Sequence, residues 1–310
     1  STLFLFMARQ NNLAIVIPAY KSTFLAAALD SIAAQTCQDF TLYIGDDCSP
    51  NHLEDIVDRY RDKINLVYKR FDTNLGGKDL VAQWERCIDM TQDEEWLWLF
   101  SDDDVMEARC VEEFYKTKDK NSQLYHFNIK ICDKKGRITK IPHFYPSNLQ
   151  TEKFVDSHLF GPLVNAVVEF VFSRELYLKA NKFENFDLAW GSDFITWVKF
   201  SALNNGITTI PKSFVHWRIS DENISPNKSH DIVVRKLNAI VGNYVVLKNI
   251  FKKNNFKYSF RYDLIILKVL LRNRHYISKH EGYEVLETFG KRQGVLLTSK
   301  VFKILWMLLK

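Results

Sequence analysis

The sequence predicts an α/β protein with a mostly parallel central sheet and flanking helices, and three observations predict it. Short β-rich apolar runs alternate with segments of helical spacing over the first hundred residues. Each run ends in a polar or turn-forming loop, as is typical of parallel strands at the ligand-binding edge of an open sheet. The 310 residues, 46% of them hydrophobic, suffice for one large domain and a smaller one.

The expected elements of the first part follow in a regular order. Strands are expected at 14–17, 41–44, 64–68 and 96–100, and helices at 24–34, 52–61 and 80–90. The loops that follow these strands are expected to line up along one edge of the sheet.

After residue 104, the expected strands and helices no longer alternate regularly. A helix at 111–115, a strand at 124–131, a hairpin turn at 134–137, a strand at 166–172, a helix at 194–203 and a last strand at 214–219 are expected. Residues 142–165 contain three prolines and predict a long ordered loop over a site.

The C-terminal region differs in charge and period. Residues 229–310 hold 16 Lys and Arg against 5 Asp and Glu, whereas residues 1–228 carry a net negative charge. The helical period dominates from Asp231 onward, with a second helix over 264–271. The segment 295–310 has the profile of an interfacial amphipathic helix, or equally of a helix docked on the protein's own core.

The sequence argues against several classes of protein, because it lacks their motifs. Neither G-x-G-x-x-G, G-x-x-x-x-G-K-[ST], H-E-x-x-H nor G-x-S-x-G occurs. The five cysteines include no C-x-x-C pair, which favours a reducing compartment over a zinc site or disulfide framework. No apolar run is long enough to predict a membrane-spanning helix.

An acidic triplet, Asp102, Asp103 and Asp104, follows the apolar run 96–100 and Ser101. Three carboxylates this close repel one another unless a cation, a partner or a proton compensates them. Oxygen ligands of this kind select Mg²⁺, Mn²⁺ or Ca²⁺. The alternative is a solvated loop that caps a helix.

Four motifs, taken in order, resemble the family 2 glycosyltransferases with the GT-A fold, of the bacterial polysaccharide or O-antigen type. They are Ile15–Tyr20, Asp46-Asp47, Asn74-x-Gly76 and Ser101–Asp104, each at the end of an expected strand. The resemblance covers residues 13 to about 220. It implies a metal-dependent, inverting, hexosyltransferase-type enzyme that moves a sugar from a nucleotide-diphosphate sugar, with a UDP-sugar favoured, to a hydroxyl acceptor.

The resemblance also implies a nucleotide site. Pro18, Ala19 and Tyr20 are expected to line the base pocket, and Gly76 to belong to the same site. Asp47 is expected to accept a hydrogen bond from the base edge, with Asp46 as the alternative and a turn or helix cap as the structural explanation for either.

The resemblance assigns roles within the triplet as well. Asp102 is expected to face the ribose, Asp103 to bind a Mn²⁺ or Mg²⁺ ion that bridges the diphosphate, and Asp104 to be an auxiliary ligand. A literal Asp-x-Asp alignment gives Asp102 and Asp104 instead. The sequence leaves this register open by one residue.

Asp193 is the expected general base, because it resembles the acidic pair that precedes the corresponding helix in the family. Ser192 replaces the Glu of that pair, and a helix cap is the alternative role for Asp193. Weaker expectations are contacts of His216, Arg218 and Lys78 with metal or diphosphate. A sugar-stacking platform is a further weak expectation, for Trp190, Trp197 and Trp217, with core packing as the default.

The chain is therefore expected to divide into an N-terminal extension (1–12), a GT-A catalytic domain (13–228) and a basic helical subdomain (229–310). Within the extension, Met7 is expected to be the natural start. The expected acceptor is a glycan or lipid-linked glycan, and the expected location is the cytoplasm, with a peripheral contact of the C-terminal helices on the inner face of the plasma membrane. One alternative is a nucleotide-sugar binding protein without turnover. The other, which rests on the basic tail alone, is an RNA-binding module. No nucleic-acid motif occurs, however, and the chain is not expected to bind nucleic acid.

Overall fold

The computed structural model of the chain describes residues 12–220 and 228–310. The expected N-terminal extension, Met7 included, thus lies outside the described residues except for its last residue. The boundary expected between residues 228 and 229 directly follows the second undescribed segment and stays a prediction.

The first part of the sheet is parallel, as expected. Its strands are β1 (Leu13–Ala19), β2 (Thr41–Asp46), β3 (Leu66–Arg70) and β4 (Trp96–Leu99), in the spatial order β3-β2-β1-β4. The helices between them are α1 (Leu25–Ala33), α2 (Leu53–Val57), followed by a 3₁₀ turn at Asp58–Tyr60, and α3 (Leu80–Ile88). β1 pairs in parallel with both β2 and β4, so the carboxyl ends of these three strands meet at one edge.

The sheet becomes mixed beyond β4. Its remaining strands are β5 (Val105–Met106), β6 (Leu124–Cys132), β7 (Ile138–Lys140), β8 (Asn148–Leu149), β9 (Phe170–Ser173) and β10 (Ile207–Arg218). β9 runs antiparallel to β4 and β6, whereas β10 runs parallel to β6. The α/β class is confirmed, and every antiparallel pair includes a strand that follows β4 in the chain.

Helices α4 (Cys110–Thr117), α5 (Thr151–Leu159), α6 (Arg174–Lys179) and α7 (Ser192–Asn204), with a 3₁₀ turn at Asp187–Ala189, complete this part. The prediction of a long loop at 142–165 was wrong, because α5 lies within this segment. α5 buries residues three and four apart on one face, and the prolines flank it rather than interrupt it. The strand expected from residue 166 begins only at Phe170.

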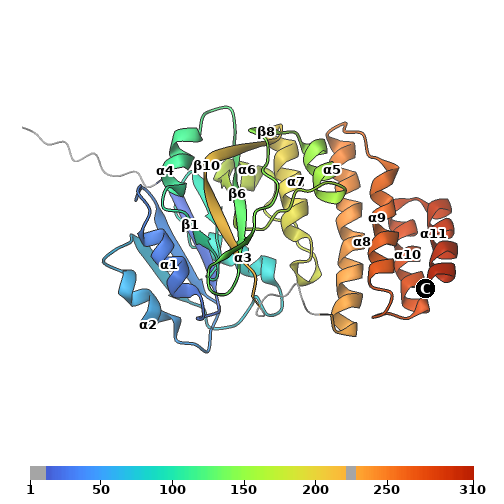
Figure 1. The fold of residues 1–310 in the computed structure, drawn as a ribbon, viewed down its shortest axis with the longest axis horizontal. Coiled ribbons are helices and arrows are strands. Elements are labelled where there is room, and N and C mark those ends of the chain that lie inside the picture. Colours follow the sequence, from blue (N-terminus) through green and yellow to red (C-terminus); the bar gives the residue numbers. More distant parts are fainter. Residues whose placement is uncertain (1–11, 221–227) are drawn as a thin grey trace, which may run out of the picture.

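The C-terminal region is helical, as expected. It consists of α8 (His230–Lys253), α9 (Phe260–Arg272), α10 (Lys279–Gln293) and α11 (Leu296–Leu309). Figure 1 shows α8 beside α7, with α9, α10 and α11 successively farther from the sheet. None of the described helices combines the length and the apolar character needed to cross a bilayer.

The side chains of β1 alternate between two cores, one on each face of the sheet. Leu13, Ile15 and Ile17 pack with α1, α2 and α4. Ala14 and Val16 belong to a second core, which continues through α5 and α7 to Phe302 and Trp306 of α11. One apolar core therefore joins the sheet to the C-terminal helices.

Candidate functional site

The acidic triplet follows β4, and its three carboxylates point to different partners. Asp102 accepts hydrogen bonds at Oδ2 from the backbone N–H groups of Tyr20 (2.8 Å) and Lys21 (2.7 Å). Asp104 accepts from the Arg218 N–H (2.7 Å) and the Ser101 hydroxyl (2.7 Å). The triplet thereby ties β4 to the ends of β1 and β10.

One cation already lies between two of these carboxylates. The Lys21 ammonium contacts Asp103 Oδ2 directly and lies 3.8 Å from Asp102 Oδ1. Burial raises the pKa of Asp102 to about 6, against the opposing effect of Lys21, and raises that of Asp104 to about 7. A cluster with this much buried negative charge favours further positive charge.

The donor set fits a hard divalent cation bound together with a substrate. Within residues 12–220 and 228–310, no three carboxylate, imidazole or thiolate side chains form a complete metal-binding cluster. Mg²⁺, however, is commonly bound by one or two carboxylates with substrate phosphates as the remaining ligands. Asp102 Oδ1 and Asp103 Oδ2 converge on one cation, the Lys21 ammonium, which indicates where such an ion would fit.

Asp46 and Asp47 lie at the end of β2, and both are buried. Asp47 accepts hydrogen bonds from the N–H groups of Leu75 (2.7 Å) and Gly76 (2.8 Å) and pairs with Arg86 (2.8 Å). A Cβ atom at Gly76 would lie 2.7 Å from Asp47 Oδ2, so only glycine permits this approach. Asp47 therefore holds the turn after β3, and its contact with a base stays a prediction.

Asp46 is directed away from this turn. Its carboxylate accepts from the Tyr68 hydroxyl (2.5 Å), Arg70 (3.1 Å) and the Ser49 N–H (2.8 Å). This difference leaves Asp47 as the one of the two that borders the Gly76 turn. Of the base-pocket residues expected on β1, Ala19 is buried, Pro18 half-buried and Tyr20 42% exposed, so Tyr20 has surface available for a ligand.

Asp193 lies in the first turn of α7, and it is not the helix cap. The N-cap is Gly191, in the left-handed conformation (φ 78°), with no side-chain capping bond. Asn165 donates to Asp193 Oδ2 at 3.4 Å, and burial raises the pKa of Asp193 to about 6. The Ser192 hydroxyl accepts the Phe186 N–H (3.0 Å), which gives it a structural role.

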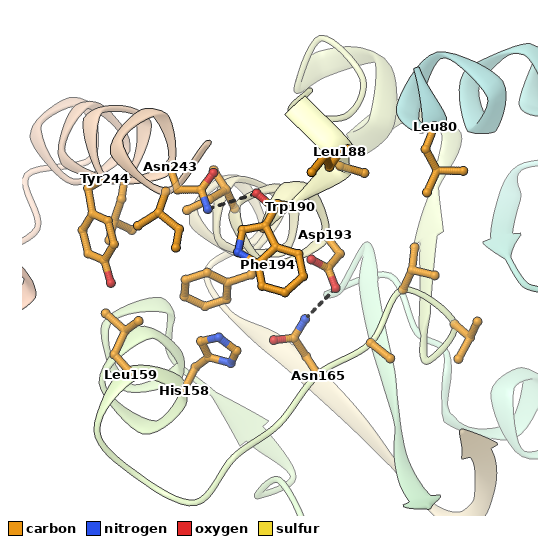
Figure 2. Close-up of a pocket in the computed structure, with 18 of the residues that line it drawn as sticks. Leu80, His158, Leu159, Asn165, Leu188, Trp190, Asp193, Phe194, Asn243 and Tyr244 are labelled. Atoms are coloured by element: carbon orange, nitrogen blue, oxygen red, sulfur yellow. Dashed lines mark hydrogen bonds between the residues drawn. The ribbon is translucent and has the colours of Figure 1, made fainter. Parts of the chain in front are cut away.

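A cavity of about 470 Å³ brings the triplet and Asp193 together. Asp104 and Asp193 both line it, with Trp190 and Trp217 on its walls. Figure 2 shows Asp193 pointing toward Asn165, with His158 on the other side of Asn165. A carboxylate with a pKa near 6 beside an open cavity is suited to accept a proton.

The weaker expectations have mixed outcomes. Trp197 is fully buried against Phe170, so core packing is correct for it. Arg218 is buried and donates to the backbone carbonyls of Asp103 (2.7 Å), Asp133 (3.0 Å) and Lys134 (3.2 Å). Its side chain therefore stabilises the backbone of the triplet.

His216 and Lys78 have other surroundings. The His216 imidazole lies 3.1 Å from the Glu107 carboxylate, on the part of β10 that pairs with β5. Lys78 is exposed just before α3. Contacts of either side chain with a metal or a diphosphate stay predictions.

The sequence did not indicate His158, Asn165 and Asn243, which also line the cavity. They come from α5, the loop before β9 and α8, and no spacing in the sequence links them. A buried pair beneath this loop positions Asn165: Glu169 accepts the Ala166 N–H (3.0 Å) and lies 3.2 Å from His126. Burial raises the pKa of Glu169 and lowers that of His126, because it disfavours the charged form of each.

The chain is similar to known transferases in sequence. The sequence model of the family described as glycosyl transferase family 2 matches residues 14–180. A segment of 66 residues is 35% identical to poly(ribitol-phosphate) beta-N-acetylglucosaminyltransferase TarS of Staphylococcus aureus. That segment spans 20% of this chain and only 12% of the length of that relative.

Solved structures extend the likeness over most of the chain. S. aureus TarS 1-349 in complex with UDP-GlcNAc matches with a TM-score of 0.59 at 15% identity, covering 94% of this chain and 90% of that one. GalNAc-T7 with UDP, GalNAc and Mn²⁺ matches with a TM-score of 0.57 at 12% identity, over 81% and 55%. The mannosyltransferase PcManGT of Pyrobaculum calidifontis with GDP-Man and Mn²⁺ matches with 0.52 at 13%, over 96% and 84%.

These structures share the fold of this chain. The family model covers more than half of the residues. The chain belongs to glycosyl transferase family 2 and has the GT-A fold.

Proposed function

We propose that the chain is a metal-dependent, inverting glycosyltransferase of the hexosyltransferase type, which moves a sugar from a nucleotide-diphosphate sugar to a hydroxyl of an acceptor. One observation carries this proposal: Asp104 of the acidic triplet and Asp193 line the same cavity. The reaction needs a cation-binding group at the leaving diphosphate and a base at the attacking hydroxyl, with the anomeric carbon between them.

The donor is assigned to the strand-end edge. Pro18, Ala19 and Tyr20 line the base pocket, Asp47 and Gly76 border it, and Asp102 faces the ribose. A UDP-sugar is favoured, because both S. aureus TarS and GalNAc-T7 were solved with UDP or a UDP-sugar, although PcManGT was solved with GDP-Man.

The metal, Mn²⁺ or Mg²⁺, is assigned to Asp103 with Asp104 as the auxiliary ligand, and the Asp102 carboxylate borders the same position. When bound, it would neutralise the charge that develops on the departing nucleoside diphosphate. Lys21, which contacts Asp103, would help to hold that negative charge.

The acceptor hydroxyl gives its proton to Asp193 as its oxygen attacks the anomeric carbon from the side opposite the leaving group. A single displacement of this kind inverts the configuration and requires no covalent intermediate. Asn165, the hydrogen-bond partner of Asp193, keeps the carboxylate directed at the cavity.

The acceptor is a glycan or a lipid-linked glycan of a bacterial surface polymer, a context that the name of S. aureus TarS supports. We place the enzyme in the cytoplasm, with a peripheral contact on the membrane. The support is α11, whose outward stripe of Leu297, Val301, Ile304 and Leu308 is between 48% and 77% exposed. Lys300 on the same helix and Lys310 directly after it would favour anionic lipid.

A thermal-shift screen tests the donor assignment. UDP-, GDP-, dTDP- and CMP-sugars are added with Mn²⁺ or with EDTA, and a ligand at 100 times its Kd should add about 2.7 kcal/mol of stability. We expect one nucleotide class to stabilise the chain with Mn²⁺, and transfer or donor hydrolysis to stop in EDTA and return with Mn²⁺ or Mg²⁺. Equal activity in EDTA would contradict the metal assignment, and binding without turnover would favour a non-catalytic binding protein.

A further inference from the structure

The cavity beside Asp193 has two chemically different ends. One end carries Asp104, Asp193 and Asn165. The other end is aliphatic, and its side chains come from α5, α8 and α9: Leu159, Ile240, Leu247, Ile265 and Val269. Figure 2 shows α8, with Asn243 and Tyr244, facing Leu159 and His158 across the space.

This space is too large to be a packing defect. Protein interiors contain few voids larger than a water molecule, whereas pockets for small ligands measure about 300–1,000 Å³. At about 470 Å³ the cavity falls in the second range. It lies between elements of the sheet part and the C-terminal helices, a common position for ligand pockets.

Polar atoms without partners surround the middle of the cavity. Among the described residues, His158 Nδ1 and the amide oxygens of Asn165 and Asn243 are buried with no hydrogen-bond partner. Buried polar groups are normally paired, so each unpaired one requires an explanation. These atoms have almost no accessible surface, so a sugar hydroxyl would reach one of the amide oxygens only after its side chain rotates toward the cavity.

The aliphatic side chains, by contrast, offer a sugar no hydrogen bonds, and the polar side chains beside them on α8 are Asn243 and Tyr244. A saccharide unit placed against Ile240, Ile265 and Val269 would lose its hydration without gaining hydrogen bonds. An alkyl or prenyl chain placed there would gain from leaving water.

We infer that the acceptor joins an aliphatic aglycone to the sugar that carries the attacking hydroxyl. The sugar occupies the middle of the cavity between Asp193, Asn165 and Asn243, and the chain of the aglycone lies against α8 and α9. This inference rests on the proposed function, because it takes Asp193 as the base that defines the acceptor's position.

Alkyl glycosides provide the probe. Methyl and octyl glycosides of glucose, galactose and N-acetylglucosamine are added below micelle-forming concentrations to the full chain, and saturation-transfer NMR and calorimetry measure binding. We expect at least one octyl glycoside to bind at least tenfold tighter than its methyl counterpart, because the added methylene groups leave water. The chain protons should then receive strong saturation.

Single substitutions test where the octyl chain of the probe binds. Ile240→Asn, at a half-buried position that lines the cavity, should reduce octyl binding about tenfold and leave methyl binding unchanged. Val245→Asn, a half-buried position on the same helix outside the lining, should change neither. If Ile240→Asn fails to fold, Val269→Trp, which fills the aliphatic end, replaces it with the same expectation.

A further variant distinguishes binding in the cavity from binding on the outer surface. Leu297→Gln on α11 removes an exposed side chain that could bind detergent-like molecules. Loss of octyl binding in Leu297→Gln but not in Ile240→Asn would overturn the inference, and so would equal affinity for methyl and octyl glycosides. The nucleotide screen is read independently, so failure of donor binding would count against the proposed function and not against the cavity.

Discussion

The carboxylate of Asp193 combines a buried position with open space in front of it. Its titratable neighbours around the cavity are Asp104, His158 and, beneath the loop, Glu169. Burial lowers the pKa of His158 to about 4, raises that of Asp104 to about 7 and also raises that of Glu169. Asp193, with a pKa of about 6, is the assigned proton acceptor, and its ionisation should limit proton transfer when a bound metal ion keeps Asp104 ionised.

We therefore expect kcat/KM to fall about tenfold per pH unit below pH 6 and to level off above it, because only ionised Asp193 accepts a proton. Asp193→Asn should lower transfer about 10²–10⁴-fold and leave nucleotide binding nearly intact. Steady-state rates across pH and calorimetric titration of the donor check both statements. Near wild-type transfer by the Asn variant would refute the base assignment.

The sequence indicated the acidic residues of the site, but it left their division of labour open. Asp102, Asp103 and Asp104 are adjacent, and their roles depend on partners 81 to 114 residues away, namely Lys21 and Arg218. His158, Asn165 and Asn243 carried no signal, since a lone polar residue becomes part of a site only when the fold assembles its neighbours.

Among the elements, the turn after β3 depends on one side chain. Asp47 is the acceptor for two backbone N–H groups, of Leu75 and Gly76, and the ion-pair partner of Arg86. Removing the carboxylate leaves these donors without their acceptor next to a buried strand end.

Asp47→Ala should therefore cost about 2–4 kcal/mol of unfolding free energy in urea denaturation. Asp72→Ala, at an exposed position in the same loop, is the matched control and should change it by less than about 0.5 kcal/mol. An Asp47→Ala chain as stable as the control would mean that the turn is held by other contacts.

Strands and helices with a strong period were predictable, and short ones were not. β1 to β4 and α8 follow from apolar runs and from a helical stripe that is mostly buried. α5 was mistaken for loop because only Thr151, Phe154 and Val155 are buried in it, and nearby prolines outweighed so short a stripe. β5, β7 and β8 span two or three residues each, too few to show a period.

For the molecule as a whole, the charge asymmetry of the sequence coincides with a structural one. The region 229–310, which carries a net positive charge, forms helices whose inner faces belong to the same apolar core as one face of the sheet. The last of them, α11, leaves an apolar stripe exposed. Within the segment 295–310, Phe302 and Trp306 dock on the protein, whereas Leu297 and Leu308 are exposed, and a contact of these two with a membrane stays a prediction.

We expect the chain to float with vesicles that contain anionic lipid and not with neutral ones, because charge and exposed apolar surface act together. Leu297→Gln with Leu308→Gln should reduce flotation severalfold without changing the melting temperature, since both side chains are more than 75% exposed. Glu284→Gln, an exposed change on α10, is the control. Unchanged flotation of the double variant would exclude α11 as the contact.

Helices α8 and α9 form part of the cavity wall, and this has an evolutionary consequence. The strand ends assigned to the donor lie within residues 14–180, whereas Ile240, Leu247, Ile265 and Val269 lie beyond them. If the chain of the acceptor lies against α8 and α9 as we infer, changes in these two helices should alter which molecule receives the sugar while the residues assigned to the nucleotide stay the same. Exchanging α8 and α9 between relatives would then redirect an unchanged sugar donor to a new acceptor.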